Sequence, residues 1–212
     1  MALSALLLCA ALAQNAPPSA ELSSGGKATM AVRLGAKASP AVRAVASDLA
    51  RMLGRLSGAE FAVEAGDGAG GIVIGRPADF AALPFAASFG SGPFEREDYV
   101  LRSTPTGLYL LGASDLAVSH AAWDVLHRLG FRQFFPGTPW EVLPSARDLS
   151  IAVDSRESPA FHARRIWYNW GLWGYNDVPY REWCVRNRRS GPGLRSNDSC
   201  IRTRTRAGRS TR

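Results

Sequence analysis

Few side chains in this sequence have the types and spacing that chemistry requires. His120 and His127 lie seven residues apart on an expected helix, so both face roughly the same side. No carboxylate or third ligand stands at metal spacing from them, whereas a zinc site needs such a set. No Ser-His-Asp or Cys-His arrangement has supporting local sequence either. We therefore expect surface or boundary histidines, no metal site and no cofactor.

A glycine cluster at residues 66–71, GDGAGG, is the second feature that attracts a chemical interpretation. A phosphate-binding Walker loop requires Gly-Lys followed by Ser or Thr at the start of a helix. Here the glycines precede a short apolar run, 72–75, that is typical of a buried strand. We interpret the cluster as a hairpin turn.

The apolar pattern predicts an α+β fold, a mixed sheet with helices packed on one face. One helix begins after Ser39, with Pro40 at its first position, and ends at Gly58. A second helix spans 115–129 and ends before Gly130. Strands are expected at 29–34, 60–65, 72–75, 99–102, 108–111, 131–135 and 149–153.

The N-terminus has the pattern of an export signal. Residues 1–13, MALSALLLCAALA, form an apolar run that ends in an A-x-A cleavage signature. The run is too short to span a bilayer, which needs roughly 20 residues. We expect a signal peptide, a linker at 14–26, a secreted or periplasmic location and no stable membrane anchor.

Positive charge is concentrated at the other end. The 212 residues carry a formal charge of +7, and residues 181–212 hold 10 Arg against Glu182 and Asp198. Three interpretations of 188–212 remain open: translation out of frame, a disordered basic tail, or a nucleic-acid-binding arm. We favour the first and expect no nucleic-acid partner. Because Cys200 lies in this tail, we expect no structural disulfide with Cys184.

A longer pattern runs from 107 to 144. It contains a strand ending in Gly112, a helix carrying Ala-Ala-Trp at 121–123, then LGFRQFFPG at 129–137 and EVLP at 141–144. This pattern resembles the N-terminal domain of α-glucuronidases and β-N-acetylhexosaminidases. It is most similar to a bacterial family that joins such a domain to a glycosidase-like barrel. The resemblance extends over roughly 29–165, and the expected domain over 27–157.

In those enzymes this domain is non-catalytic and packs against a (β/α)₈ barrel that begins directly after it. The segment SPAFHARRIW, 158–167, is similar to the family's entry into the first barrel strand. The resemblance implies that Arg165, Trp167, Asn169 and Trp170 line a sugar subsite in a full-length enzyme. Packing between domains is the alternative role for these side chains.

Only 53 residues follow Pro159, whereas a barrel needs about 200 at the least. We therefore expect residues 158–187 to be the start of an incomplete (β/α)₈ barrel in a truncated or frameshifted chain. Residues 160–187 are expected to be poorly ordered or aggregation-prone, because a first barrel strand without partners leaves an open edge. Asp177 and Glu182 are the only acids in this stretch, and nothing places them as the carboxylate pair that glycosidases use. Hydrolysis by this chain alone is not expected.

Three functional hypotheses follow. The first is a non-catalytic accessory domain of an exported glycoside hydrolase in carbohydrate degradation, whose partners are a carbohydrate and the missing barrel domain. The second is a stand-alone carbohydrate-binding module that uses the Trp-rich segment 167–183. The third is a basic nucleic-acid-binding protein that uses the Arg-rich tail.

Overall fold

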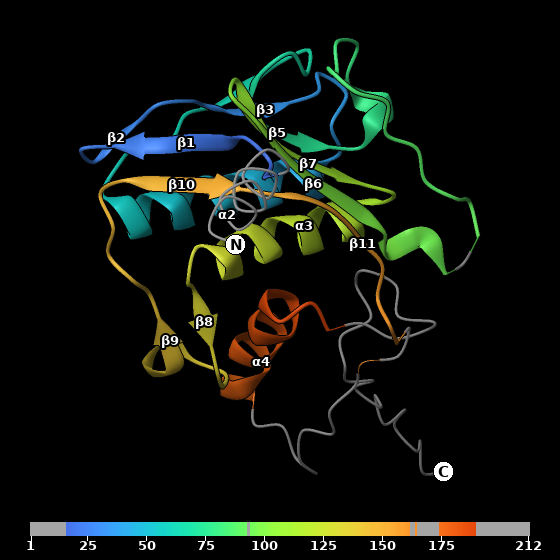
Figure 1. The fold of residues 1–212 in the computed structure, drawn as a ribbon. Helices are drawn as coiled ribbons and strands as arrows, with labels where there is room; N and C mark the ends of the chain where they lie inside the picture. Colours follow the sequence, from blue (N-terminus) through green and yellow to red (C-terminus); the bar gives the residue numbers. More distant parts are fainter. Residues whose placement is uncertain (1–15, 93, 162–163, 165–173, 190–212) are drawn as a thin grey trace, which may run out of the picture.

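A computed structural model describes residues 16–92, 94–161, 164 and 174–189. These residues form an α+β fold with a mixed sheet, as the sequence predicts, and they contain three α-helices, one more than expected (Figure 1). The helices are α2 (Pro40–Ser57), α3 (Asp115–Arg128) and α4 (Gly174–Arg186), and the strands are β1 (Ser19–Ser24), β2 (Lys27–Ala28), β3 (Val32–Leu34), β4 (Val63–Ala65), β5 (Gly71–Gly75), β6 (Tyr99–Thr104), β7 (Gly107–Gly112), β8 (Arg132–Gln133), β9 (Glu141–Val142), β10 (Leu149–Ala152) and β11 (Asp154–Glu157).

The main sheet has six strands in the order β11-β6-β7-β5-β3-β4. Strands β4, β3, β5 and β7 run parallel to one another, while β6 is antiparallel to both β7 and β11. A second sheet, β10-β1-β2, lies beside it, and β8 pairs with β9 in a separate hairpin. The expected hairpin of β6 and β7 is confirmed, with Thr104 opposite Gly107.

We call the described residues from 16 to 157 the body. Its two expected helices, α2 and α3, have the ends that their sequences predict. The side chain of Ser39 accepts a hydrogen bond from the backbone N–H of Val42, and Gly58 closes α2 in the left-handed region with φ +75°. Helix α3 begins in the same way at Ser114, whose side chain accepts from Ala117 N–H. These caps fix where each helix starts against the sheet.

The side chains of β7 alternate between two apolar clusters, one on each face of the main sheet. Leu108 and Leu110 of β7 point to the face that α2 and α3 cover, and they join the large apolar core there. Tyr109 and Leu111 point to the opposite face, where side chains of the 76–94 loop cover them. Phe85 of that loop meets Tyr109 edge-on at 5.2 Å between ring centroids. Both faces of the sheet are thus protected from water, one by helices and the other by a loop.

The structure corrects the expectation of a linker at 14–26. Residues Ser19–Ser24 form β1, which pairs antiparallel with β10 more than a hundred residues later. Ala20 and Leu22 are fully buried in the core. The segment is rich in Ser, so composition favoured a linker, but two apolar side chains at alternate positions are enough to seat a short strand.

The hairpin-turn interpretation of the glycine cluster is also wrong. Strands β4 and β5 both run parallel to β3, one on each side of it, so the chain between them crosses over rather than turning back. This crossing passes close to the side chain of Arg33. A Cβ on Gly71, whose φ is +91°, would lie 2.9 Å from Arg33 Cγ. The glycines are needed for this close approach.

The region after the body differs from expectation as well. Within residues 160–187, expected to be poorly ordered or aggregation-prone, Gly174–Arg186 forms α4, a helix that the sequence does not predict. Figure 1 shows α4 beside α3 and the β8–β9 hairpin. No barrel strand is present among residues 158–161, 164 and 174–189, and the start of a barrel stays a prediction.

Burial of Leu22 gives a direct test of β1. We expect Leu22→Ala to lower the free energy of unfolding by about 2–5 kcal/mol, because it leaves a cavity in the core. The neighbouring Glu21 is exposed, so Glu21→Ala should change that free energy by less than about 0.5 kcal/mol. Urea denaturation followed by circular dichroism measures both. Equal, small effects from the two substitutions would mean that β1 is not part of the folded core.

Candidate docking site

The candidate functional site is the surface where the residues after the body return to it. Arg164, helix α4 and Arg188 just after it contact five residues of the body, which we call the docking face: Glu97, Tyr99, Asp124, Gln133 and Glu141. The three acids of this face are largely buried, and each receives one arginine from the later segment. A buried carboxylate is costly unless a charge and hydrogen bonds accompany it.

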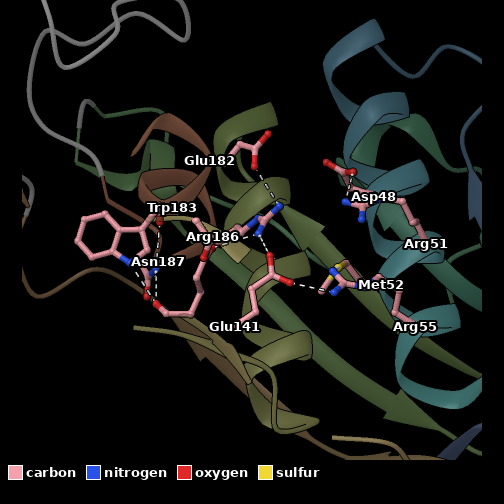
Figure 2. Close-up of polar contacts among 11 residues, drawn as sticks. Asp48, Arg51, Met52, Arg55, Glu141, Glu182, Trp183, Arg186 and Asn187 are labelled. Atoms are coloured by element: carbon pink, nitrogen blue, oxygen red, sulfur yellow. Dashed lines mark hydrogen bonds and ion pairs between the residues drawn. The ribbon is translucent and has the colours of Figure 1, made fainter. Parts of the chain in front are cut away.

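Glu141 joins three elements. It lies in β9, and its side chain is 5% exposed. One of its oxygens accepts from Arg55 of α2 at 2.9 Å, and the other accepts from Arg186 of α4 (Figure 2). Burial alone would raise the pKa of Glu141, but the hydrogen bonds from Arg55 and Arg186 bring it below its usual value. The carboxylate therefore stays charged and ties α2 to α4.

Gln133 of β8 receives the end of α4. Its carbonyl oxygen accepts from Trp183 Nε1 at 3.1 Å and from Asn187 Nδ2 at 3.2 Å. Its side-chain oxygen accepts from Arg186 Nη1 at 3.1 Å. Arg186 also lies 5.6 Å above the Trp123 ring, a cation–π contact. Figure 2 shows the Arg186 side chain reaching Glu141, with Trp183 and Asn187 to one side of this contact.

Asp124 of α3 holds the second arginine. Its oxygens accept from Tyr99 OH at 3.1 Å and from Arg128 Nε at 3.2 Å, and they lie 3.2 Å from Arg188 Nη1. Arg188 also donates to the Tyr99 hydroxyl at 2.7 Å. Burial, with the nearby charge of Asp124, raises the pKa of Tyr99 well above its ordinary value. Tyr99 is therefore a neutral hydrogen-bonding group here, not a base.

Arg188 reaches this position through an unusual backbone conformation. Its φ is +51°, in the left-handed region that glycine normally occupies. Arg188 N–H donates to the Val185 carbonyl and Arg189 N–H to the Cys184 carbonyl, the pattern of a Schellman cap at the end of α4. A non-glycine residue there costs on the order of 1–3 kcal/mol. The contacts to Tyr99 and Asp124 offset that cost.

Glu97 holds the third arginine. The residue is 2% exposed, pairs with Arg164, and lies 3.6 Å from Nδ1 of His120. Arg164 Nε also donates to the carbonyl of Arg188 at 3.0 Å, and Arg189 donates to the carbonyl of Arg164 at 3.1 Å. The chain before α4 and the chain after it are thus bound to one another as well as to the body.

A cavity of about 240 Å³ lies at this junction. Body residues Glu97, Tyr99 and His120 line one side, and Arg164 and Arg188 line the other. The acids and arginines around it are already paired with one another, so charge is balanced within the junction. This arrangement supports docking of one segment on another.

The structure corrects the expectation for one histidine. His120, expected at the surface or boundary, is 4% exposed. Burial lowers the pKa of His120 to about 4, which the nearby Glu97 opposes, and Arg164 and Arg188 lower it further. Burial also lowers the pKa of His127, a half-buried residue, to about 4. Both rings are neutral at pH 7. No group of three His, Cys, Asp or Glu side chains within the described ranges could hold a metal ion.

The residues that the resemblance assigns to a sugar subsite, Arg165, Trp167, Asn169 and Trp170, lie outside the described residues. Cys184 is buried, and Cys200 lies outside the described part. The structure adds Glu97, Asp124 and Glu141, which the sequence analysis did not select as functional. Only Glu141 had a signal, as the first residue of EVLP. In the part of the chain that the structure describes, no helix is both long and apolar enough to cross a membrane.

Comparison with known proteins gives a limited result. No protein-family model matches the chain, and no curated protein matches it. Among solved structures it is similar to the N-acetyl-β-hexosaminidase of Streptomyces plicatus in complex with Thio-NAglucal, at 22% identity and a TM-score of 0.41. It is also similar to the β-N-acetylhexosaminidase of Streptomyces coelicolor, at 20% identity and a TM-score of 0.40. Each match covers 70% of this chain but only 25% and 26% of those chains. Values this low leave the family open.

The depressed pKa of His120 predicts a loss of stability in acid. The folded state holds His120 neutral down to about pH 4, while the unfolded chain takes up a proton near pH 6.5. Its contribution is therefore present above pH 6.5 and falls by up to about 3 kcal/mol as the pH drops through 4. Urea melts between pH 7 and pH 4 should show a shallower decline for His120→Gln than for the parent chain. Parallel declines would contradict the assignment.

The double ion pair of Glu141 predicts release of α4. We expect Glu141→Gln to lower the free energy of unfolding by about 1–3 kcal/mol, because two arginines lose their charged acceptor. Trypsin should then cut at Arg181 and Arg186 sooner than in the parent chain. The exposed pair of Arg33 with Glu64 provides the control, since Glu64→Gln should cost at most about 1 kcal/mol. Identical digestion of all three proteins would show that Glu141 does not hold the helix.

Proposed function

We propose that this chain is the non-catalytic N-terminal accessory domain of an exported glycoside hydrolase, in a truncated or frameshifted product. The observation that carries the proposal is the docking face: three largely buried acids of the body each bind an arginine of the segment that follows. The sequence pattern at 107–144, which resembles the accessory domain of α-glucuronidases and β-N-acetylhexosaminidases, supplies the enzyme class.

The motif residues have structural roles that suit a scaffold. Gly130 takes φ +98° after α3, Phe131 is fully buried, and Gly137 takes φ +99° at the turn of the β8–β9 hairpin. Glu141 then binds α4. The residues from 129 to 144 therefore build the hairpin that receives the next part of the polypeptide, and none of them is arranged for bond cleavage.

The docking role also accounts for two of the positive charges in the segment that follows the body. Arg186 and Arg188 belong to the basic region from 181 onward, yet they are ion-paired with buried acids of the body, Glu141 and Asp124. Their charge is therefore used in docking. This argues against a nucleic-acid-binding role for these two arginines, because phosphate contacts require accessible cations. Export rests on the pattern at residues 1–13, which lie outside the described part.

Extension of the reading frame tests this proposal. We expect the locus, resequenced past codon 188, to continue in frame into a barrel, and the longer protein to hydrolyse p-nitrophenyl N-acetylglucosaminide or glucuronide. The 212-residue chain should release no nitrophenol from either. In the longer protein, Glu141→Gln should shorten the half-life of activity at raised temperature and leave KM unchanged. A confirmed stop after Arg212, or hydrolysis by the chain alone, would overturn the proposal.

A further inference from the structure

The β8–β9 hairpin carries three exposed aromatic rings. Phe134, Phe135 and Trp140 are 66%, 50% and 53% exposed, whereas Trp123 and Phe131 nearby are buried. The hairpin lies apart from the main sheet, beside α4 (Figure 1). Aromatic side chains in contact with water this way lose the burial that normally stabilises them. The docking contacts described above for Trp183, Arg186 and Asn187 involve Gln133 and Glu141 rather than these rings, so the rings need a separate explanation.

A backbone hydrogen bond joins Phe134 to Trp140, and a ring contact joins Phe135 to Trp140. Gln133 pairs with Glu141, and both point to the docking face. The next pair outward is joined by a hydrogen bond from Phe134 N–H to the Trp140 carbonyl, 3.1 Å long. Phe134 directly follows β8, and Trp140 is the last residue of the 3₁₀ helix Thr138–Trp140 that precedes β9, so both residues lie just beyond the paired strands. Phe135 meets Trp140 with ring centroids 5.7 Å apart.

The rings are held in place before any ligand arrives. Trp140 N–H donates to the Gly137 carbonyl at 3.2 Å, and Gln133 Nε2 donates to the same oxygen at 3.3 Å. Pro136 and Pro139 restrict the turn between the strands. Because Gln133 and Glu141 also anchor the hairpin to α4, a ligand that packs on the rings does not have to order them first.

The chemistry of this surface favours a neutral ligand. No charged residue occurs from 133 to 140, and the loop offers ring faces, the Thr138 hydroxyl and backbone carbonyls. A standard protein interface needs about 800 Å² from each partner, contributed by some 20 residues or more. Here the exposed large apolar side chains of the hairpin are Phe134, Phe135, Trp140 and Val142. This number fits a small ligand better than a protein.

We propose that Phe134, Phe135 and Trp140 form a binding surface for neutral oligosaccharides. The C–H groups on one side of a pyranose ring carry slight positive charge and pack against the negative face of an aromatic ring. The Thr138 hydroxyl and the turn carbonyls are available to the sugar hydroxyls at the edge. The choice of carbohydrate rests on the proposed function, in which this domain accompanies a glycoside hydrolase, and it gives that domain a substrate-holding role distinct from docking.

Isothermal titration of the 212-residue chain with chitohexaose, xylohexaose and hexagalacturonate tests the inference. We expect binding of at least one neutral hexaose, weaker binding of the anionic one, and a loss of about tenfold or more in affinity for Trp140→Ala and Phe134→Ala. Trp140→Tyr, which keeps a ring, should retain binding within about threefold by the same reasoning. Phe161→Ala removes an exposed ring elsewhere, 73% exposed, and should change nothing.

Two results would overturn the inference. One is the absence of heat with every hexaose at millimolar concentration, while trypsin shows α4 still docked; the docking role would then stand without a sugar site. The other is self-association in sedimentation that disappears in Trp140→Ala, which would make the hairpin a protein contact. A stop codon confirmed after Arg212 would remove the enzyme from the proposed function and would leave the titration result unchanged.

Discussion

Pairing of buried carboxylates is the constraint on which the later half of this structure depends. Glu97, Asp124 and Glu141 all lie where little water reaches them. A charged carboxylate in such a place costs several kcal/mol unless cations and hydrogen bonds compensate for the lost hydration. Residues of the body supply part of this compensation through Arg55 and Arg128. The rest comes from the segment after the body, and that segment is thereby fixed in position.

Local signals made the helices of the body predictable. Ser39 and Pro40 at one end and Gly58 at the other define α2 by interactions within a few residues, and the structure confirms them. The same holds for the β6–β7 hairpin. Strand β1 was missed because its signal is only Ala20 and Leu22, and its partner β10 is far away in the chain. A contact of that range leaves no pattern in a local window.

The candidate site could not be predicted for a related reason. Charged side chains are mostly exposed in proteins, so Glu97 and Asp124 look like surface residues in the sequence. Their partners Arg164 and Arg188 stand more than sixty residues later. Helix α4 also lacks a clear apolar stripe: it buries Tyr180 and Cys184, and polar contacts from Trp183 and Arg186 join it to β8 and β9. Periodicity of apolar residues therefore gave no reason to expect it.

The central claim is that the body is a docking scaffold for the residues that follow it. Native-state hydrogen exchange of the intact chain, read out by mass spectrometry on peptides spanning 174–189, tests this most directly. We predict that the amides of α4 exchange at pH 7 much more slowly than those of a free peptide, since α4 opens only when the docking contacts break. Exchange of α4 at the rate of a free peptide, with α3 still protected, would contradict it.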